Sequence, residues 1–140
     1  MKNILAEALS VGVGAASNAE IDRGNIRWAS ELAMKRAIAN LKRRPDMVLV
    51  DGFPLKDVDY PQMGIRQGDR KCASIAAASI VAKVLRDGLM EMFDKACCGY
   101  GLAKNKGYGT VGHYAAIQKM GPTSLHRKSF KLKSQGSLNP

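Results

Sequence analysis

The sequence predicts a single α/β domain with a partly parallel sheet. Apolar runs of strand length alternate along the chain with segments of helical spacing, and helices that cross between strands usually connect parallel neighbours. The chain has 140 residues, of which 46% are hydrophobic and 24% are charged. This size and composition suit one globular domain with a hydrophobic core of its own.

Residue spacing predicts the elements of the first half. Residues 10–17, SVGVGAAS, alternate apolar residues with small ones, which predicts a strand with one bare face that another backbone can approach closely. Asn25 is a suitable N-cap for a helix from Ile26 to about Arg43, followed by the helix-breaking Pro45. Residues 47–50, MVLV, then predict a buried strand.

The second half is dominated by helix signals. A short extended piece is expected over 62–67, and an alanine-rich helix over 68–98 that is interrupted or weakened at Gly88. Residues 99–110 are typical of a glycine-rich basic loop, and residues 111–120 predict a short helix that Gly121 ends. Residues 131–140 are expected to form a basic, flexible tail.

Charge and cysteine content narrow the function class. The net charge is +10 and no acidic residue follows Asp94, which favours a nucleic acid as partner, although a solubilising basic tail explains the charge equally well. Three cysteines without a C-x-x-C pair argue against a disulfide framework and favour the cytoplasm. No apolar run reaches the roughly 20 residues that cross a bilayer, so no membrane partner is expected.

Two carboxylates stand at ends of predicted extended segments. Asp51 directly follows the strand at 47–50, and Asp69 ends GIRQGD just before the long helix. Carboxylate oxygens suit Mg²⁺, and two such ions about 3.5–4 Å apart can promote phosphodiester cleavage. Alternatively, Asp69 is a helix N-cap and Asp51 a turn residue. Two carboxylates are also too few for a complete two-metal site.

The segment KNKGYGT, residues 104–110, is the candidate substrate-binding loop. Gly107 allows the backbone to approach a phosphate, Lys104 and Lys106 neutralise charge, and Tyr108 offers a flat face to a base or sugar. The alternative is a flexible loop with a packed tyrosine.

Further substrate contacts are expected from basic residues near these two features. They are Arg70 and Lys71, which follow Asp69, and His126 and Arg127 in the basic C-terminal region. His113, at the start of a predicted helix, is expected to have a structural role.

Four stretches together resemble the type 2 ribonucleases H, specifically bacterial ribonuclease HII. The resemblance covers roughly residues 5 to 130. Its stretches are EIDRGNIRWASELAMKRAIANL with VLVDG, GDRKCASIAAASIVAKVLRD, GYGLAKNKGYGTVGH and GPTSLHRKSF. The resemblance implies a ribonuclease H-like mixed sheet flanked by helices, with strand order 3-2-1-4-5. It also implies a monomeric endonuclease that cuts RNA in RNA–DNA hybrids and single ribonucleotides embedded in duplex DNA.

Residue roles carry over at three positions of this sequence. The family uses four carboxylates and two Mg²⁺ or Mn²⁺ ions. Asp51 matches the third carboxylate, a metal ligand, and Asp69 matches the fourth, beside the second metal and the attacking water. Tyr108 matches the tyrosine that stacks on the deoxyribose after the ribonucleotide, whose 2′-hydroxyl marks the cleavage site.

The sequence also departs from the family pattern. The D-E-A-G-R-G motif with the first two carboxylates, and the D-S-K segment after it, occur nowhere in the 140 residues. Residues 1–130 are therefore expected to be the C-terminal part of a type 2 ribonuclease H domain, lacking the first two strands of the family fold, so that 10–17 cannot pair with the strand before Asp51.

Two consequences are expected from these departures. Activity of this chain alone should be severely impaired, and a non-catalytic basic nucleic-acid-binding fragment is the alternative function. Arg70 stands where the family has a small residue, and it either crowds the metal site or adds a phosphate contact.

Overall fold

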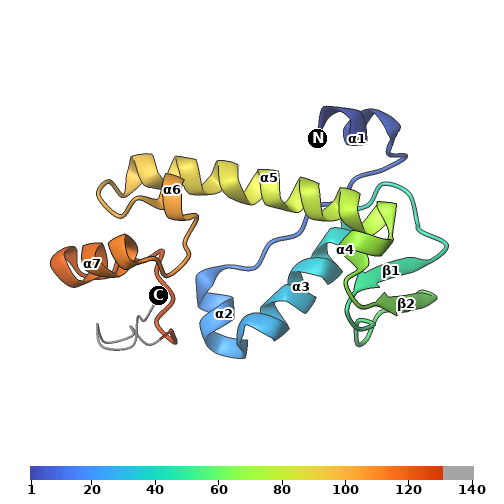
Figure 1. Cartoon of the computed structure of the whole chain (residues 1–140). Helices are drawn as coiled ribbons and strands as arrows, with labels where there is room; N and C mark the ends of the chain where they lie inside the picture. The colour runs from blue at the N-terminus through green and yellow to red at the C-terminus, as the bar shows by residue number, and fades with distance from the viewer. Residues whose placement is uncertain (131–140) are drawn as a thin grey trace.

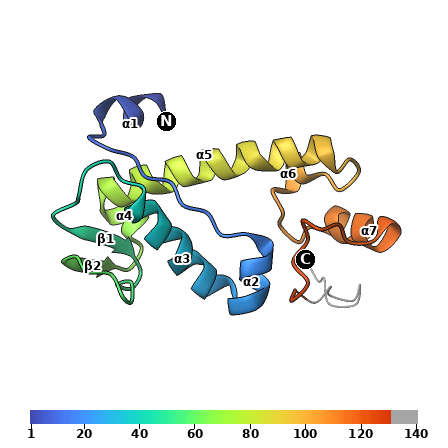
Figure 2. The ribbon, with the colours of Figure 1, turned by 180° about the vertical axis from the view of Figure 1, so that it is seen from behind.

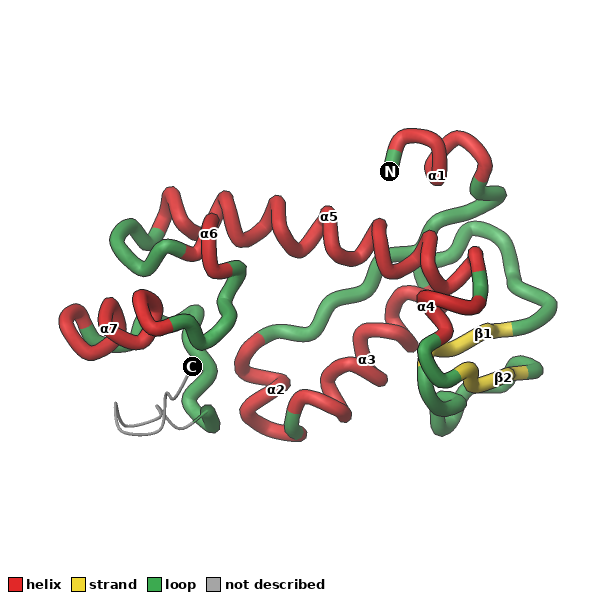
Figure 3. Tube along the Cα trace, in the orientation of Figure 1, coloured by secondary structure: helices red, strands yellow, loops and turns green. Residues whose placement is uncertain are grey.

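The computed structural model describes residues 1–130, and the tail predicted over 131–140 lies outside the described residues. Figure 1 and Figure 3 show the helices and strands along the chain. In chain order these elements are α1 (Lys2–Glu7), α2 (Asn18–Gly24), α3 (Ile26–Ala39), β1 (Val48–Asp51), β2 (Gln62–Ile65), α4 (Gly68–Lys71), α5 (Ala73–Ala96), α6 (Leu102–Asn105) and α7 (Val111–Met120).

Helix α5 organises the molecule. The helix runs along most of the length of the molecule, with α4, β1 and β2 beside its first turns, α6 beside its last turns and α7 near the same end (Figure 1). Helix α3 runs from α2 towards α4 and the strands, and the same arrangement is visible from behind (Figure 2). The sheet and the 104–110 loop therefore lie towards opposite ends of one long helix.

The two strands are parallel, as expected for an α/β fold. They pair from Val48 with Gln62 to Asp51 with Ile65, and they form the only sheet within residues 1–130. The strand predicted over 47–50 is confirmed with a shift of one residue. Its buried side chain is that of Val50. Both strands have their carboxyl ends at the same edge.

Residues 10–17 do not form the predicted strand. They are extended but pair with no strand, and they lie along α3 instead. A Cβ atom at Gly12 or Gly14 would collide with carbonyl oxygens of α3, so the bare face does meet another backbone closely. Arg36 donates a hydrogen bond of 2.7 Å to the carbonyl of Ala15, and Asn40 one of 2.8 Å to that of Val13. Side chains of a helix thus bond backbone carbonyls that a neighbouring strand would otherwise pair, in keeping with the expectation that 10–17 cannot pair with the strand before Asp51.

Two helix boundaries also differ from the prediction. Helix α3 begins as expected, with the Asn25 side chain accepting from the N–H of Trp28, but it ends at Ala39 rather than near Arg43. Asn40, at its C-terminal end, uses its side chain to hold residues 10–17. The helix predicted over 68–98 breaks at Cys72, which has extended backbone angles, and continues without interruption through Gly88.

Helices α2 and α6 were not predicted, whereas α7 has the predicted bounds 111–120. Helix α2 carries a capping box, in which Ser17 and Glu20 bond each other's backbone N–H groups. Glu20 also forms an ion pair of 2.6 Å with Arg36, and this hydrogen bond is the main cause that lowers the pKa of Glu20 to about 2. The pair fixes α2 to α3.

The C-terminal part of the described chain is bound to α2. The Asp22 carboxylate accepts hydrogen bonds from the backbone N–H groups of Lys128 and Ser129 and from the Ser129 hydroxyl, at 2.6–2.9 Å. These bonds, those from Ser129 first, lower the pKa of Asp22. Asn18 adds a bond of 2.7 Å to the carbonyl of Ser124. Residues separated by more than 100 positions are therefore joined.

The described residues have a small core. Tyr100, Leu102 and Ile117 form a buried cluster against the end of α5, whereas Met47, Phe53 and Met63 around the strands are more than half exposed. None of the helices within residues 1–130 has the length and hydrophobicity that crossing a membrane requires. The fold class is a mixed α/β arrangement with a parallel strand pair, which fits the ribonuclease H-like fold expected from the sequence.

Candidate functional site

The edge where both strands end carries the two predicted carboxylates. Asp51 is the last residue of β1, and its Oδ1 accepts a hydrogen bond of 2.8 Å from the backbone N–H of Gly68. Asp69 is the next residue, in the first turn of α4. A Cβ at position 68 would meet the end of the Ile75 side chain, which would have to shift to make room for it. Asp51 is therefore hydrogen-bonded to the residue that immediately precedes Asp69.

The N-cap alternative for Asp69 is wrong. The N-cap of α4 is Gln67, which has left-handed backbone angles and makes no side-chain capping bond. The side chain of Asp51 accepts from a distant segment, while the turn after β1 is made by Gly52 with a φ of 95°. Both carboxylates are exposed, so they can reach a ligand at the edge of the sheet.

The donor atoms suit a hard divalent cation. Carboxylate oxygens are preferred ligands of Mg²⁺ and Mn²⁺, and Asp51 keeps Oδ2 beside the oxygen that binds Gly68. Within residues 1–130, no three His, Cys, Asp or Glu side chains are grouped so that they could hold a metal ion. Asp51 and Asp69 thus bring two carboxylates, the donor type that such a cation prefers, to the edge where both strands end.

Basic residues surround this edge. Arg70 is exposed on α4 immediately after Asp69. Lys71 donates a hydrogen bond of 2.9 Å from Nζ to the carbonyl of Arg66, the residue that follows β2. Neither residue makes an ion pair with Asp51 or Asp69 among the described residues.

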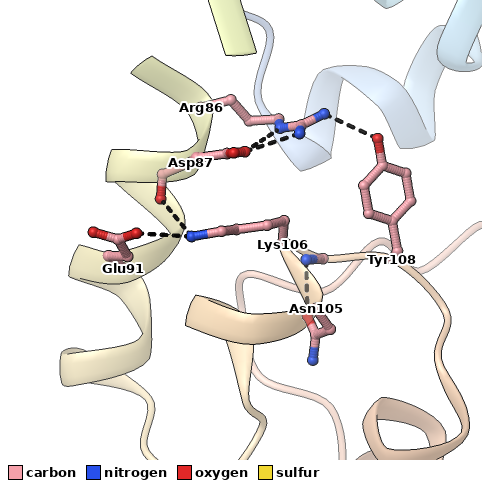
Figure 4. A network of polar contacts seen from close by, with 7 residues as sticks. Arg86, Asp87, Glu91, Asn105, Lys106 and Tyr108 are labelled. Atoms are coloured by element: carbon pink, nitrogen blue, oxygen red, sulfur yellow. Dashed lines mark hydrogen bonds and ion pairs between the residues drawn. The ribbon is translucent and has the colours of Figure 1, made fainter. Parts of the chain in front are cut away.

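Tyr108 is held by Arg86 on α5 (Figure 4). The residue is nevertheless 61% exposed. Arg86 donates a hydrogen bond of 3.0 Å to the Tyr108 hydroxyl, and its guanidinium carbon lies 5.4 Å from the ring centroid. Asp87 in turn accepts two hydrogen bonds from Arg86, at 2.8 and 3.1 Å. The hydroxyl is therefore fixed and the ring stays available for stacking. This arrangement disagrees with the alternative of a packed tyrosine.

The other loop residues differ in whether their polar groups are already bonded within the protein. Lys106 has left-handed backbone angles, and its Nζ forms an ion pair of 2.8 Å with Glu91 on α5 (Figure 4). Its charge is therefore already compensated. Lys104 is exposed on the short α6. Gly107 has a φ of 79°, and its N–H donates to the Asn105 side chain at 2.8 Å rather than pointing to an open site.

Asn105 and Arg86 were missed by the sequence analysis. Asn105 is buried, and its amide donates a hydrogen bond of 2.7 Å to the carbonyl of Tyr100 while its oxygen fixes Gly107. It shapes the loop that carries Tyr108. Its one signal is its place two residues before Gly107 in a segment rich in turn residues. Arg86 has no local signal, because its partner is distant in sequence.

The two histidines form a packed pair. His113 is buried, and its ring stacks on that of His126 with the centroids 5.3 Å apart. Nδ1 of His126 accepts from the N–H of Thr123 at 2.9 Å, and Nε2 is buried without a partner among the described residues. The structural role expected for His113 agrees with this geometry, whereas a phosphate contact by His126 does not follow from it. Arg127 lies over the ring of Phe130.

The predicted residues thus fall into two groups. Asp51, Asp69 and the residues after Asp69 lie at the first turns of α5, and the 104–108 loop is bound further along the same helix through Arg86. The rise of an α-helix places Arg86 about 20 Å from the start of α5. Arg127 belongs to neither group, because its segment is bound to α2.

Comparison with known proteins adds the family. A model of the family described as ribonuclease HII matches residues 2–133. A ribonuclease HII of Rhizorhabdus wittichii is 52% identical over 134 residues, which are 96% of this chain and 66% of the relative. Ribonucleases HII of Clostridioides difficile and Moorella thermoacetica are 51% and 52% identical, over 89% of this chain and 49% and 61% of their own lengths. The chain thus spans about half to two thirds of these relatives, and it belongs to the ribonuclease HII family.

Proposed function

We propose that this protein serves as a metal-dependent endonuclease. Its substrates are the RNA strand of RNA–DNA hybrids and single ribonucleotides embedded in duplex DNA. Family membership supports the reaction. The observation that carries the assignment of residues is the hydrogen bond from Gly68 to Asp51, which brings a second carboxylate, Asp69, to the edge where both strands end.

Asp51 and Asp69 would hold the divalent cation, Mg²⁺ or Mn²⁺. A cation bound there supplies positive charge that stabilises phosphodiester hydrolysis. The hydrogen bond from Gly68 orients the Asp51 carboxylate, so its second oxygen already points in a defined direction before a cation binds. Asp69 would bind at the same edge and help to position the attacking water.

Tyr108 would bind the sugar next to the cleavage site. Its ring is exposed and its hydroxyl is fixed by Arg86, which suits stacking on a flat face.

The residues of this chain supply an incomplete set of ligands. Two carboxylates are too few to balance two metal ions beside a phosphodiester, and no group of three ligands occurs within residues 1–130. We therefore propose that the 140 residues alone turn over far more slowly than the longer relatives, and that full activity needs carboxylates from outside these residues.

A cleavage assay tests this proposal. A duplex with one embedded ribonucleotide and the matched all-DNA duplex are incubated with the 140-residue protein, with and without Mg²⁺ or Mn²⁺. We expect slow, metal-dependent cleavage of the first duplex alone, at least about 100-fold below a full-length relative, and its loss in Asp51→Asn. Equal cleavage of both duplexes contradicts the substrate assignment, and turnover equal to that of the relative contradicts the incomplete site.

The second candidate is a non-catalytic nucleic-acid-binding protein. The net charge of +10 and the absence of a three-ligand group within residues 1–130 favour it. It predicts duplex binding that weakens steeply with salt and no cleavage at any metal concentration. Cleavage that disappears in Asp51→Asn contradicts it.

We further propose that the protein is monomeric and works in the cytoplasm. The three cysteines, Cys72, Cys97 and Cys98, are all free in the structure, which suits a reducing compartment. Sedimentation analysis tests the oligomeric state.

A further inference from the structure

An exposed aromatic ring stands beside Asp51 between two arginines. Phe53 follows Asp51 by two residues and is 60% exposed. The guanidinium carbon of Arg66 lies 5.4 Å from the centroid of its ring, and that of Arg27 lies 5.9 Å away. Arg66 directly follows β2, and Arg27 is in the first turn of α3. Three separate elements therefore bring these side chains to the edge where both strands end.

The arrangement gathers like charges at one place. Arg27 uses Nε for a contact of 3.4 Å with Glu31, and its side chain is 75% exposed. The guanidinium of Arg66 makes no ion pair among the described residues, and the Nζ of Lys71 lies 2.9 Å from the Arg66 carbonyl. Both guanidinium groups stand near one ring, so an anion bound there would be attracted by both.

The same place is hollowed. Arg27, Glu31, Asp51 and Phe53 border an open hollow of about 250 Å³ between α3 and the end of β1. Asp51 and Phe53 thus line one space. In the proposed function the scissile phosphate lies at Asp51. Consecutive phosphates of a strand are one nucleotide apart, so a neighbouring phosphate would be within reach of this hollow.

We propose that Phe53 holds Arg27 and Arg66 as a phosphate-binding pair for the nucleic-acid backbone beside Asp51. The inference rests on the proposed function and extends it by naming where the strand is held. Guanidinium groups bind phosphate oxygens through two parallel hydrogen bonds, and stacking on an aromatic ring pre-orients them for this. Contacts to phosphate position a strand without reading its sequence, so the pair serves RNA and DNA strands alike.

The salt dependence of binding tests the proposal. Fluorescence anisotropy with Ca²⁺ in place of Mg²⁺ gives the affinity of the 140-residue protein for the ribonucleotide-containing duplex and for the matched all-DNA duplex, over a series of salt concentrations. The variant is Arg27→Gln with Arg66→Gln. We expect the slope of log affinity against log salt to fall by about two for both duplexes, because each phosphate contact contributes about one.

The matched control is Arg43→Gln with Arg44→Gln. Arg44 lies 5.1 Å from the ring centroid of Tyr60, so it makes the same kind of contact, but both arginines precede β1 at the opposite end of the strands. The control removes the same charge. We expect its slope of log affinity against log salt to stay within about half a unit of the slope of the unsubstituted protein. An equal fall in both double variants overturns the proposal.

The ring is tested separately with Phe53→Leu, which keeps both charges. We expect affinity to fall several-fold at low salt; affinity and slope equal to those of the unsubstituted protein overturn the role of the ring. Thermal unfolding checks each variant, and if a double variant is unfolded, the single variants Arg27→Gln and Arg66→Gln are each expected to lower the slope by about one. An unsubstituted protein that binds neither duplex overturns the proposed function as well, whereas binding with unchanged slopes overturns the phosphate pair alone.

Discussion

Asp51 accepts a hydrogen bond of 2.8 Å from the backbone N–H of Gly68, which joins the end of β1 to the start of α4. The acceptor is an exposed carboxylate and the donor belongs to a buried glycine. One side chain therefore has two tasks, because it fixes the local structure and it also presents an oxygen at the candidate metal site.

The two tasks can be separated by substitution. Asp51→Ala leaves the buried N–H of Gly68 without an acceptor and should lower the free energy of unfolding by about 1–2 kcal/mol. Asp51→Asn keeps an acceptor oxygen and should lower it by less than about 0.5 kcal/mol. Urea unfolding measures both. Equal losses in the two variants would mean that the hydrogen bond does not support the fold.

Alanine substitutions at Gly14 and Gly88 should have opposite effects on stability, because only Gly14 lies against the backbone of α3. Gly14→Ala places a Cβ against the carbonyl of Ala33 and should destabilise the protein by about 2–3 kcal/mol. Gly88→Ala, inside α5 with open space around the Cβ position, should stabilise it by about 0.5–1 kcal/mol. Thermal unfolding compares the two. A tolerated alanine at position 14 would contradict the close packing.

Arg86 should act through Tyr108. Arg86→Gln removes the guanidinium that fixes the hydroxyl, so affinity for a ribonucleotide-containing duplex should fall, and Tyr108→Ala should lower it further. Because both substitutions affect one ring, the double variant should bind no more weakly than Tyr108→Ala alone. Anisotropy titrations measure this cycle. Additive losses would show that Arg86 contributes independently of Tyr108.

The packed histidines predict acid sensitivity. Burial lowers the pKa of His126 below its ordinary value of 6.5, and the neighbouring His113 adds to this effect. The unfolded chain therefore binds the proton more readily. The neutral ring supports the fold fully above pH 6.5, and this contribution declines as the pH falls below 6.5. We expect His126→Asn to flatten the decline of unfolding free energy between about pH 7.5 and 5.5. An unchanged decline would assign it to other groups.

The sequence predicted elements well where the signals were local. The strand before Asp51 and the helix over 111–120 follow from hydrophobic runs with clear stops, and both are present nearly as predicted. The capping box of Ser17 and Glu20 is also a local signal, and the helix it begins could have been found from it.

The errors have a common physical cause. The alternation over 10–17 suits a strand, but an extended segment becomes a strand only with a partner, and here Arg36 and Asn40 provide the hydrogen bonds. Likewise, the segment before the break at Cys72 is bound to β1 by the contact between Gly68 and Asp51, which no local pattern reveals. The hydrogen bond from Arg86 to Tyr108 joins residues 22 positions apart, so it could not be predicted from spacing.

Metal binding by the two carboxylates tests the central claim most directly. Binding of Mn²⁺ is followed by the electron paramagnetic resonance signal of the free ion, in the presence of the ribonucleotide-containing duplex. Asp46→Asn is the control, since Asp46 is an exposed aspartate before the start of β1, at the opposite end of the strand from Asp51. We predict that Asp51→Asn and Asp69→Asn each weaken binding by about tenfold or more, and that Asp46→Asn leaves it unchanged. Equal Mn²⁺ binding by all three variants and the unsubstituted protein would contradict the assignment of Asp51 and Asp69 as metal ligands.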